Sequence, residues 1–506
     1  MNLTKQHLIN SKLADTTAIT SFALPEKVLQ FGTGVLLRGL PDFFIDKANK
    51  QGIFNGRIVV VKSTATGDAD AFLKQDSLYT VCIRGIQNGK KVEENILNTS
   101  INRVLSAKNE WSKVLECAAN PDMQVIISNT TEVGITLLPT DDIKSDPPES
   151  FPGKLLAFLY KRYQVFNGDV TKGMVIVPTE LITDNGKKLQ SIIEELAHLN
   201  KLEYEFIDWL ENANYFCNSL VDRIVPGKLP VAKQAEVEKQ LGYTDELMIM
   251  SEVYRLWAIE SGEEKVREVL SFAKADDGVI IAPNIDRFRE LKLRLLNGSH
   301  TFSCGLAHLA GFHTVKDAMS DDAFSTYITN LMMQEISPAI QNEEITTEDA
   351  KSFAATVLER YRNPHIDHQW LSITMQYSSK MQMRNIPTIL NYYKKVGTVP
   401  EQMALGFAAH ILFMRSEKDA LNKFWGDVNG RKYLINDDNA AYYAEAWKQF
   451  STEELITKLL SNTAHWGTDL SALPGFADAV YKNLKGLLAD GAATMLSRSK
   501  QIMVAA

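Results

Sequence analysis

Residues 28–45 read VLQFGTGVLLRGLPDFFI, and this stretch decides the fold of the first half of the chain. A short apolar run, Val28 to Phe31, leads into the turn Gly32-Thr33-Gly34, and a helical pattern then continues through Ile45. Glycines let a backbone approach a pyrophosphate, and a helix N-terminus offers free N–H groups and the positive end of a dipole. The order strand, glycine turn and helix therefore favours a dinucleotide site.

The glycine motif is incomplete, because Leu37 stands where a third glycine is usual. A tight strand-to-helix turn that binds no ligand is the alternative interpretation. The turn follows the first strand of an α/β pattern, and Arg38 comes soon enough to assist a phosphate, which favours cofactor binding. The predicted cofactor contacts in this stretch are Phe31, Gly32, Thr33, Gly34, Val35, Leu36 and Arg38.

Further short apolar runs extend the α/β pattern along the first half. Each is rich in β-branched residues and too short for a free-standing helix, which predicts strands buried on both faces of a parallel sheet. The predicted strands are Val28–Phe31, Ile58–Val61, Val125–Ser128, Met174–Val177 and Val279–Ala282. Two alternating runs around Asn88-Gly89, between Leu78 and Asn98, predict an antiparallel insertion with a tight hairpin turn.

The pattern changes near residue 285. Long amphipathic segments such as Glu348–Arg362 and Glu401–Met414 follow, and they predict an all-helical second domain. A chain of 506 residues also exceeds the usual size of a single hydrophobic core. We therefore expect an α/β domain over residues 1–284 and a helical domain over residues 285–506, with a ligand cleft between them.

Composition narrows the function classes. A net charge of −8 and an isoelectric point near 5.7 give no field that favours nucleic acid or an anionic membrane, so a small-molecule substrate is expected. Neither a signal peptide nor an apolar span of eighteen residues is visible, which predicts a cytoplasmic protein. The 4 cysteines lack a Cys-x-x-Cys pair, and the HxxH of His365 and His368 lacks further ligands, so no metal is predicted.

The end of the second strand bears on cofactor choice. An acidic residue usually holds the ribose 2′-hydroxyl there, but this chain has Lys62 followed by Ser63. Lys62 alone would indicate a 2′-phosphate and NADP. A solvated lysine at a strand end is the alternative.

A second decisive stretch begins just after the last predicted strand. On a continuous helix Lys292, Asn297 and His300 fall within an arc of about 140°, so they can share one pocket. A partly buried lysine can exchange a proton with a carbonyl oxygen, while Asn297 and His300 supply hydrogen bonds to the oxyanion without a metal. The alternative is a basic helix face with His300 satisfied in the core.

These stretches together resemble the long-chain polyol dehydrogenase family, which includes mannitol dehydrogenase. The resemblance rests on QFGTGVLLRG (Gln30–Gly39), SNTTEVG (Ser128–Gly134), NSLVDRIVP (Asn218–Pro226), KLRLLNGSHT (Lys292–Thr301) and RYRNPHI (Arg360–Ile366), and it covers nearly the whole chain. It implies a Rossmann-type N-terminal domain, a helical C-terminal domain and NAD(H). It also implies that Lys292 is the catalytic acid/base, that Asn297 and His300 polarise the carbonyl, and that Thr131 and Glu132 contact the cofactor.

Within the family the likeness is strongest to the branch that reduces keto sugar acids. Polyol-oxidising members have an asparagine where this chain has Glu180, so the role of Glu180 in substrate binding stays open. A uronate carboxylate calls for a fixed cation, and Lys380 and Arg384 are candidates, with a solvated helix face as the alternative. Asp222 and Arg223 either touch substrate or form a structural ion pair.

Other functions stay open from the sequence. A fructuronate reductase or a mannitol-type polyol dehydrogenase would share every catalytic residue, and a nucleotide-binding regulator would keep the fold without the chemistry. A monomer or a small homo-oligomer is expected.

Overall fold

The computed structural model describes residues 1–11, 16–62, 69–130 and 133–504. By contacts it forms two compact units. The first comprises Met1–Gly85 and Lys91–Ile285, and the second comprises Ile86–Lys90 and Asp286–Ala506. Each unit has its own hydrophobic core, and each is described by itself below.

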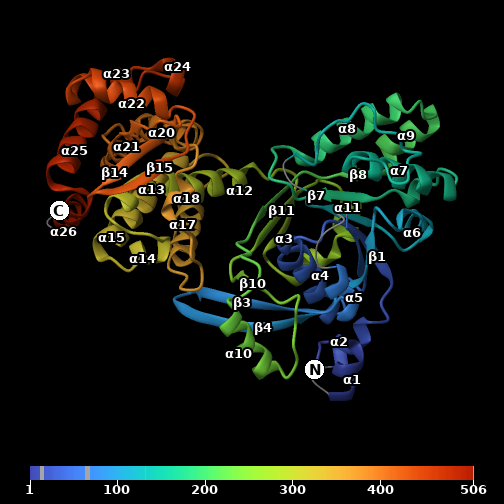
Figure 1. The fold of residues 1–506 in the computed structure, drawn as a ribbon. Coiled ribbons are helices and arrows are strands. Elements are labelled where there is room, and N and C mark those ends of the chain that lie inside the picture. Colours follow the sequence, from blue (N-terminus) through green and yellow to red (C-terminus); the bar gives the residue numbers. More distant parts are fainter. Residues whose placement is uncertain (12–15, 63–68, 131–132, 505–506) are drawn as a thin grey trace. The chain divides into compact units, whose positions relative to one another are not determined.

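A six-stranded sheet forms the centre of the first unit (Figure 1). Its strand order is β5-β2-β1-β6-β7-β8, and every neighbouring pair is parallel. The strands are β1 (Glu26–Phe31), β2 (Arg57–Lys62), β5 (Ile101–Ser106), β6 (Val125–Ser128), β7 (Val175–Pro178) and β8 (Tyr215–Phe216). The strands predicted near residues 28, 58, 125 and 174 are therefore confirmed as parallel strands of one sheet.

Alternate residues of these strands enter two different cores, which explains why the strands are continuously apolar. Val28 and Val60 face one core, while Leu29 and Val59 face the other. Helices α7, α8 and α9 gather beside β7 and β8 and cover the second face (Figure 1). A sheet buried on both faces is typical of α/β proteins with crossover helices.

The helices of the first unit are mostly short. They are α1 (Lys5–Ser11), α2 (Thr16–Ser21), α3 (Val35–Gly39), α4 (Pro41–Lys50), α5 (Ala69–Lys74), α6 (Trp111–Glu116), α7 (Phe151–Val165), α8 (Asn185–Leu199), α9 (Tyr204–Ala213), α10 (Val231–Leu241) and α11 (Glu264–Val269), with 3-10 turns η1 (Cys117–Ala119), η2 (Val170–Lys172) and η3 (Ser271–Ala275). Together with the parallel sheet they give the Rossmann-like arrangement that the sequence predicts.

The strand order contains a switch point at β1. The chain passes from β1 to β2 on one side and later returns to β6 on the other side, where Phe31 pairs with Ser128. Ligands of open α/β sheets bind outside the carboxyl ends of the strands at such a point. The glycine turn after β1 and the loop after β6 both lie at this edge.

Two small sheets complete the first unit. The predicted strand at residue 279 is β12 (Val279–Ala282), which pairs with β11 (Leu256–Glu260), and β11 pairs with β9 (Ser219–Asp222). The other sheet has the order β10-β3-β4, with β3 (Tyr79–Gln87), β4 (Lys90–Asn98) and β10 (Ile249–Glu252). Asn88 and Gly89, which are grouped with the second unit, join β3 to β4 with φ of 53° and 71°, while β10 runs parallel to β3, a pairing that the sequence did not predict.

The second unit is mainly helical. Its elements are α12 (Asp286–Leu291), η4 (Lys292–Gly298), α13 (Ser299–Leu309), α14 (Val315–Met319), α15 (Asp322–Asn330), η5 (Leu331–Ile336), α16 (Ser337–Ile340), α17 (Thr347–Tyr361), α18 (Trp370–Ile373), α19 (Tyr377–Lys380), η6 (Met381–Asn385), α20 (Ile386–Lys395), α21 (Glu401–Phe413), α22 (Ala440–Gln449), α23 (Thr452–Leu460), α24 (Thr463–Trp466), η7 (Leu470–Ala472), α25 (Phe476–Asp490) and α26 (Ala492–Val504). Three of these segments, η4, η5 and η6, are π-helices. Helices α17 and α21 match the two amphipathic segments predicted near residues 348 and 401.

The prediction of an all-helical second domain is wrong in one region. Strands β13 (Glu417–Lys418), β14 (Phe424–Val428) and β15 (Arg431–Ile435) form an antiparallel sheet. Asn429 and Gly430 make its turn with φ of 52° and 78°, the same dipeptide and conformation as at Asn88-Gly89. Among the described residues, no helix is long and apolar enough to cross a membrane.

Candidate active site

The glycine turn after β1 needs glycine at its first position. Gly32 has a φ of +127°, which L side chains rarely adopt. A Cβ there would lie 2.9 Å from Leu37 Cδ1 and 3.0 Å from the Asn129 carbonyl oxygen. A Cβ at Gly34, by contrast, would have no neighbour within 4 Å. The turn is therefore closely packed at Gly32 and open at Gly34.

The helix after this turn differs from the prediction. Instead of continuing through Ile45, it ends at Gly39, and a second helix begins at Pro41. Leu40 between them has φ −133° and ψ −78°, which is not helical, and Pro41 provides no N–H to continue the ladder. The helix that begins at the glycine turn thus has only 5 residues, so its dipole contributes less than that of a long helix.

Arg38 lies in the core of the first unit. Its Nη1 donates to the Leu247 carbonyl at 2.6 Å, and its guanidinium lies over the rings of Phe72 and Tyr79. Only 4% of the residue is exposed. The structure therefore places Arg38 as an anchor of α3, and the phosphate contact predicted for it has to compete with these interactions.

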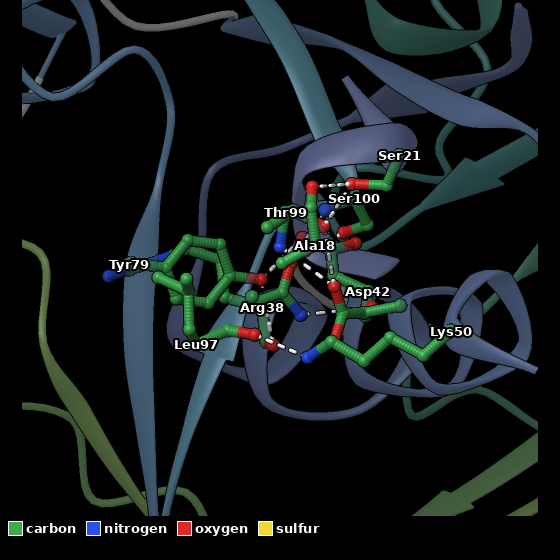
Figure 2. A network of polar contacts seen from close by, with 11 residues as sticks. Ala18, Ser21, Arg38, Asp42, Lys50, Tyr79, Leu97, Thr99 and Ser100 are labelled. Atoms are coloured by element: carbon green, nitrogen blue, oxygen red, sulfur yellow. Dashed lines mark hydrogen bonds and ion pairs between the residues drawn. The ribbon is translucent and has the colours of Figure 1, made fainter. Parts of the chain in front are cut away.

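Figure 2 shows how α4, which follows α3, is fixed to the strands beside it. Tyr79 donates to the Arg38 carbonyl at 3.1 Å and to Asp42 at 3.4 Å. Lys50 donates to the Leu97 carbonyl and to Asp46. Burial raises the pKa of Asp42 to about 7. The glycine turn is thus followed by a helix that a buried polar network holds in place.

The loops after β6 and β7 are tied to each other beside the glycine turn. Glu180 Oε1 accepts from the Thr130 N–H and hydroxyl at 2.8 and 2.9 Å, and its Oε2 accepts from Ser128 at 3.0 Å. Asn129 donates to the Thr179 carbonyl at 3.1 Å. Glu180 is only 2% exposed, so the structure gives it a role in the loop rather than at a surface. The predicted contacts Thr131 and Glu132 lie outside the described residues.

Three other predicted residues of the first unit are buried. Lys62 is 5% exposed, so the alternative of a solvated lysine at the strand end is wrong. Arg223 donates to the carbonyls of Glu252 and Gly39 and lies 4.6 Å from the Phe43 ring centre. Burial lowers the pKa of Arg223 to about 9. Asp222, at the end of β9, is 6% exposed.

The Lys292 segment of the second unit is not the regular helix that the sequence predicted. Residues Lys292–Gly298 form a π-helix between α12 and α13. In a π-helix the hydrogen bond joins residues five apart, so such residues lie above one another. Lys292 and Asn297 are five apart, and both are half-buried. The π-turn therefore aligns these two side chains more closely than an α-helix would.

The π-turn packs closely against η6. A Cβ on Gly298 would lie 3.2 Å from Asn385 Oδ1. Asn385 is buried beside this turn. In the amide orientation that satisfies both of its polar atoms, its nitrogen donates to the Gly298 carbonyl and its oxygen accepts from the Phe302 N–H, each at 3.3 Å. Arg294 also donates to the carbonyls of Met383 and Arg384. Contacts from η6 thus hold the wide turn in position.

His300 lies in an aromatic enclosure. Its ring stacks on Tyr361 at 4.2 Å and meets His368 and Trp370 edge-on at 5.1 and 5.9 Å. Burial lowers its pKa well below the usual value, and the charges of His368, Arg360 and Arg384 act in the same direction. Its Nε2 is buried without a hydrogen-bond partner among the described residues. His300 is therefore a neutral ring with one buried nitrogen whose hydrogen bond is not made among the described residues.

The two predicted substrate cations are placed differently. Arg384 Nη1 donates to Thr301 at 3.2 Å, and Thr301 donates to the Asn297 carbonyl, so Arg384 reaches the π-turn. Lys380 donates to the Ile373 carbonyl at 2.9 Å. Burial lowers the pKa of each, and both side chains are half-buried. The alternative of a solvated helix face is therefore wrong.

Sequence reasoning missed the residues that enclose His300. Tyr361 donates to the Leu296 carbonyl at 3.1 Å, and His368 lies beside the His300 ring. The segment RYRNPHIDH contained the signal, because its aromatic and imidazole groups follow the helix that packs on η4. Among the described residues, no group of three His, Cys, Asp or Glu side chains could hold a metal ion.

This geometry can bind a carbonyl compound and exchange a proton with it. The glycine turn and the loops after β6 and β7 form a ligand edge at the switch point of the sheet. The π-turn carries an amine and an amide, and the start of α13 adds an imidazole, with a guanidinium nearby. An ammonium or amide donor placed at an oxygen that gains charge is a common means of stabilising an oxyanion.

Comparison with known sequences agrees with this organisation. The Mannitol dehydrogenase Rossmann domain profile matches residues 26–270, and the Mannitol dehydrogenase C-terminal domain profile matches residues 284–488. An altronate oxidoreductase of Halalkalibacterium halodurans is 39% identical over 480 residues, which cover 93% of this chain and 92% of that protein. One from Bacillus subtilis is 38% identical over 465 residues, with 91% and 92% covered.

Solved structures show the same fold. Pseudomonas fluorescens mannitol 2-dehydrogenase, in a ternary complex with NAD and D-mannitol, has a TM-score of 0.67 at 23% identity and covers 99% of this chain and 100% of its own. A D-sorbitol dehydrogenase in substrate-free form has a TM-score of 0.70 at 18% identity, with 94% and 95% covered. The resemblance inferred from the sequence motifs is thus confirmed, and the chain belongs to the mannitol dehydrogenase family of oxidoreductases.

Proposed function

We propose that this protein catalyses the reversible, NADH-dependent reduction of tagaturonate to altronate, with Lys292 as acid and base and without a metal. The observation that carries the proposal is the buried Nε2 of His300, which has no hydrogen-bond partner among the described residues and lies at the start of α13, directly after the π-helix that holds Lys292 and Asn297. The altronate oxidoreductases that share 38–39% of their residues with this chain support the choice of substrate.

The described residues of the first unit fit a dinucleotide. Gly32 leaves no room for a Cβ, Gly34 borders open space, and Glu180 holds the loop that follows β6. Lys62 is buried and does not offer an ammonium at the surface to a 2′-phosphate, which favours NAD over NADP. When bound, NAD(H) supplies the hydride to the keto carbon or accepts it from the alcohol carbon.

Lys292 provides the proton. During reduction its ammonium gives a proton to the carbonyl oxygen as the carbon gains hydride, and during oxidation the neutral amine takes that proton back. Its half-buried position in the π-turn excludes much of the water that would compete for this oxygen. The Asn297 amide, five residues along, donates to the same oxygen and stabilises the charge that develops there.

His300 completes the proposed site beside Lys292 and Asn297. Burial lowers the pKa of its ring, so the ring is neutral near neutral pH, and a neutral imidazole has one nitrogen that donates and one that accepts. Its Nε2 is buried without a hydrogen-bond partner among the described residues. We infer that Nε2 hydrogen bonds to the substrate and thereby helps to orient its carbonyl group.

Arg384 is the proposed partner of the substrate carboxylate. It reaches the π-turn through Thr301, and a guanidinium matches a carboxylate with two parallel hydrogen bonds. Lys380 adds positive charge nearby, although its Nζ already donates to the Ile373 carbonyl. Asp222 and Arg223 are left as structural residues of the first unit.

Fructuronate reductase and a mannitol-type dehydrogenase are the enzyme alternatives, since they would use the same catalytic side chains. A panel of tagaturonate, fructuronate and fructose, each assayed with NADH and with NADPH, tests the proposal. We expect the highest kcat/KM with tagaturonate and NADH. Equal kcat/KM for fructose would exclude a carboxylate subsite, and a preference for fructuronate would change the substrate while keeping the mechanism.

A further inference from the structure

A cavity of about 650 Å³ lies in the second unit, between the end of α21, the β13–β15 sheet and α22. Its lining includes none of the proposed catalytic or substrate residues. Small-molecule sites commonly have volumes of about 300–1,000 Å³. The cavity is thus large enough for a ligand of its own.

Two tryptophans give the cavity apolar surface. Trp425 of β14 and Trp447 of α22 both line it, and both are half-buried. The Trp425 indole N–H donates to Asp419 at 2.8 Å, and that of Trp447 donates to the Ile411 carbonyl at 3.1 Å. Because these polar edges are bonded within the protein, the rings offer a ligand mainly their apolar surface.

Cationic side chains also line this cavity, and none has an ion pair within the part of the chain that the structure describes. They are Arg415, Lys418, Lys432 and Lys448. The Arg415 guanidinium lies over the Trp447 ring, 5.2 Å from its centre. Such stacking restrains a guanidinium and leaves its N–H groups available to an anion.

The acidic residues of the lining are mostly bonded locally. Asp419 accepts from the Leu421 and Lys423 N–H groups as well as from Trp425, and Asp427 accepts from the Gly430 N–H. These bonds belong to the turns between the strands. Asp427 nevertheless lies opposite Lys432 in the β14–β15 pairing, and Glu417 is the exposed chain neighbour of Lys418, so Arg415 is the cation of the lining that we expect to contribute most to binding an anion.

We propose that this cavity binds a sugar anion, which is a sugar ring that carries a carboxylate or a phosphate. One face of the ring packs on the indoles, and the anionic group bonds to Arg415 and the neighbouring lysines. A neutral sugar would leave the cations without a counter-charge, and a free inorganic anion would leave the indole surface uncovered. The site therefore favours a ligand that has both a ring and a negative charge. The site is independent of the reaction proposed at Lys292 and offers a place for an effector.

Calorimetric titration of the full chain tests the site with four probes. We use glucuronate, glucose 6-phosphate, glucose and inorganic phosphate, with Arg415→Gln, Lys432→Gln and the control Arg431→Gln, which is exposed on β15 but outside the lining. Glucuronate or glucose 6-phosphate should bind, and Arg415→Gln should weaken that binding by about 10- to 100-fold through loss of charge-assisted bonds. Arg431→Gln should leave it unchanged.

Lys292→Ala separates this site from the catalytic one, because binding in the cavity should persist in that variant. Arg415→Gln in turn should keep the basal turnover of the enzyme. The proposal is overturned if neither sugar anion binds, if Arg415→Gln and Lys432→Gln bind as well as the wild type, or if glucose or inorganic phosphate binds equally tightly. The probe that binds more tightly identifies the anionic group as carboxylate or phosphate.

Discussion

The glycine turn of the first unit and the Lys292 segment of the second unit are built by opposite means. At the glycine turn, the backbone is closely packed at Gly32 because no side chain is present, it is open at Gly34, and the Arg38 side chain is turned into the core. In the Lys292 segment, a widened turn carries Lys292 and Asn297, and the helix that continues from it carries His300. The difference indicates that the first region is suited to binding and the second to chemistry.

Replacement of Lys292 by alanine should give the largest effect. We expect kcat to fall by about 10²–10⁴-fold, the usual size of a lost general acid or base, while NADH binding is kept. Steady-state rates and NADH fluorescence titration measure the two quantities. Lys351→Ala, on the exposed face of α17, is the control and should be fully active. Unchanged turnover in Lys292→Ala would leave a nucleotide-binding regulator as the better interpretation.

Arg384→Gln tests the substrate side of the second region. Loss of a charged partner for the carboxylate should raise KM for the keto acid by about 10- to 100-fold. Since Lys380 is already bonded to the Ile373 carbonyl, Lys380→Gln should raise KM less. Equal KM values for the two variants would contradict this assignment. An equally large rise in the KM for a neutral ketose in Arg384→Gln would also contradict it.

Gly32→Ala and Gly34→Ala form a matched pair in the first region. At Gly32 a side chain meets both a strained φ and close neighbours, so we expect a loss of about 1–3 kcal/mol in unfolding free energy together with weaker NADH binding. Gly34 has φ −60° and open space, so its alanine variant should keep the wild-type stability. Chemical denaturation measures both, and equal losses would contradict the packing described here.

His300→Gln should have the smallest effect on stability at neutral pH. Since the pKa of His300 is lowered in the folded protein, its neutral ring contributes stability that is present above the unfolded value of about 6.5 and is lost as pH falls below it. Wild-type unfolding free energy should therefore fall more steeply between pH 7 and 5 than that of His300→Gln. Parallel curves would show that the pKa of His300 is the same in the folded and unfolded states.

Local sequence signals predicted much of the fold but not all of it. The apolar runs at β1, β2, β6 and β7 were clear because strands buried on both faces have no polar alternation. Asn88-Gly89 lies between two long alternating runs that predict strands, whereas the strands beside Asn429-Gly430 are short and lie among helices, so their sequence carries little strand signal. A dipeptide that favours positive φ therefore indicates a hairpin only when its flanks are read as strands.

By itself the sequence determined the central strands, the glycine turn and the spacing of Lys292, Asn297 and His300, because these depend on residue types a few positions apart. The tertiary structure decided the rest. Contacts with η6 hold the π-turn, and contacts in the core hold the Arg38 side chain. Hydrogen bonds from Ser128 and Thr130 hold the Glu180 carboxylate. Each of these depends on partners distant in the chain, and such contacts leave no periodic signal in a single sequence.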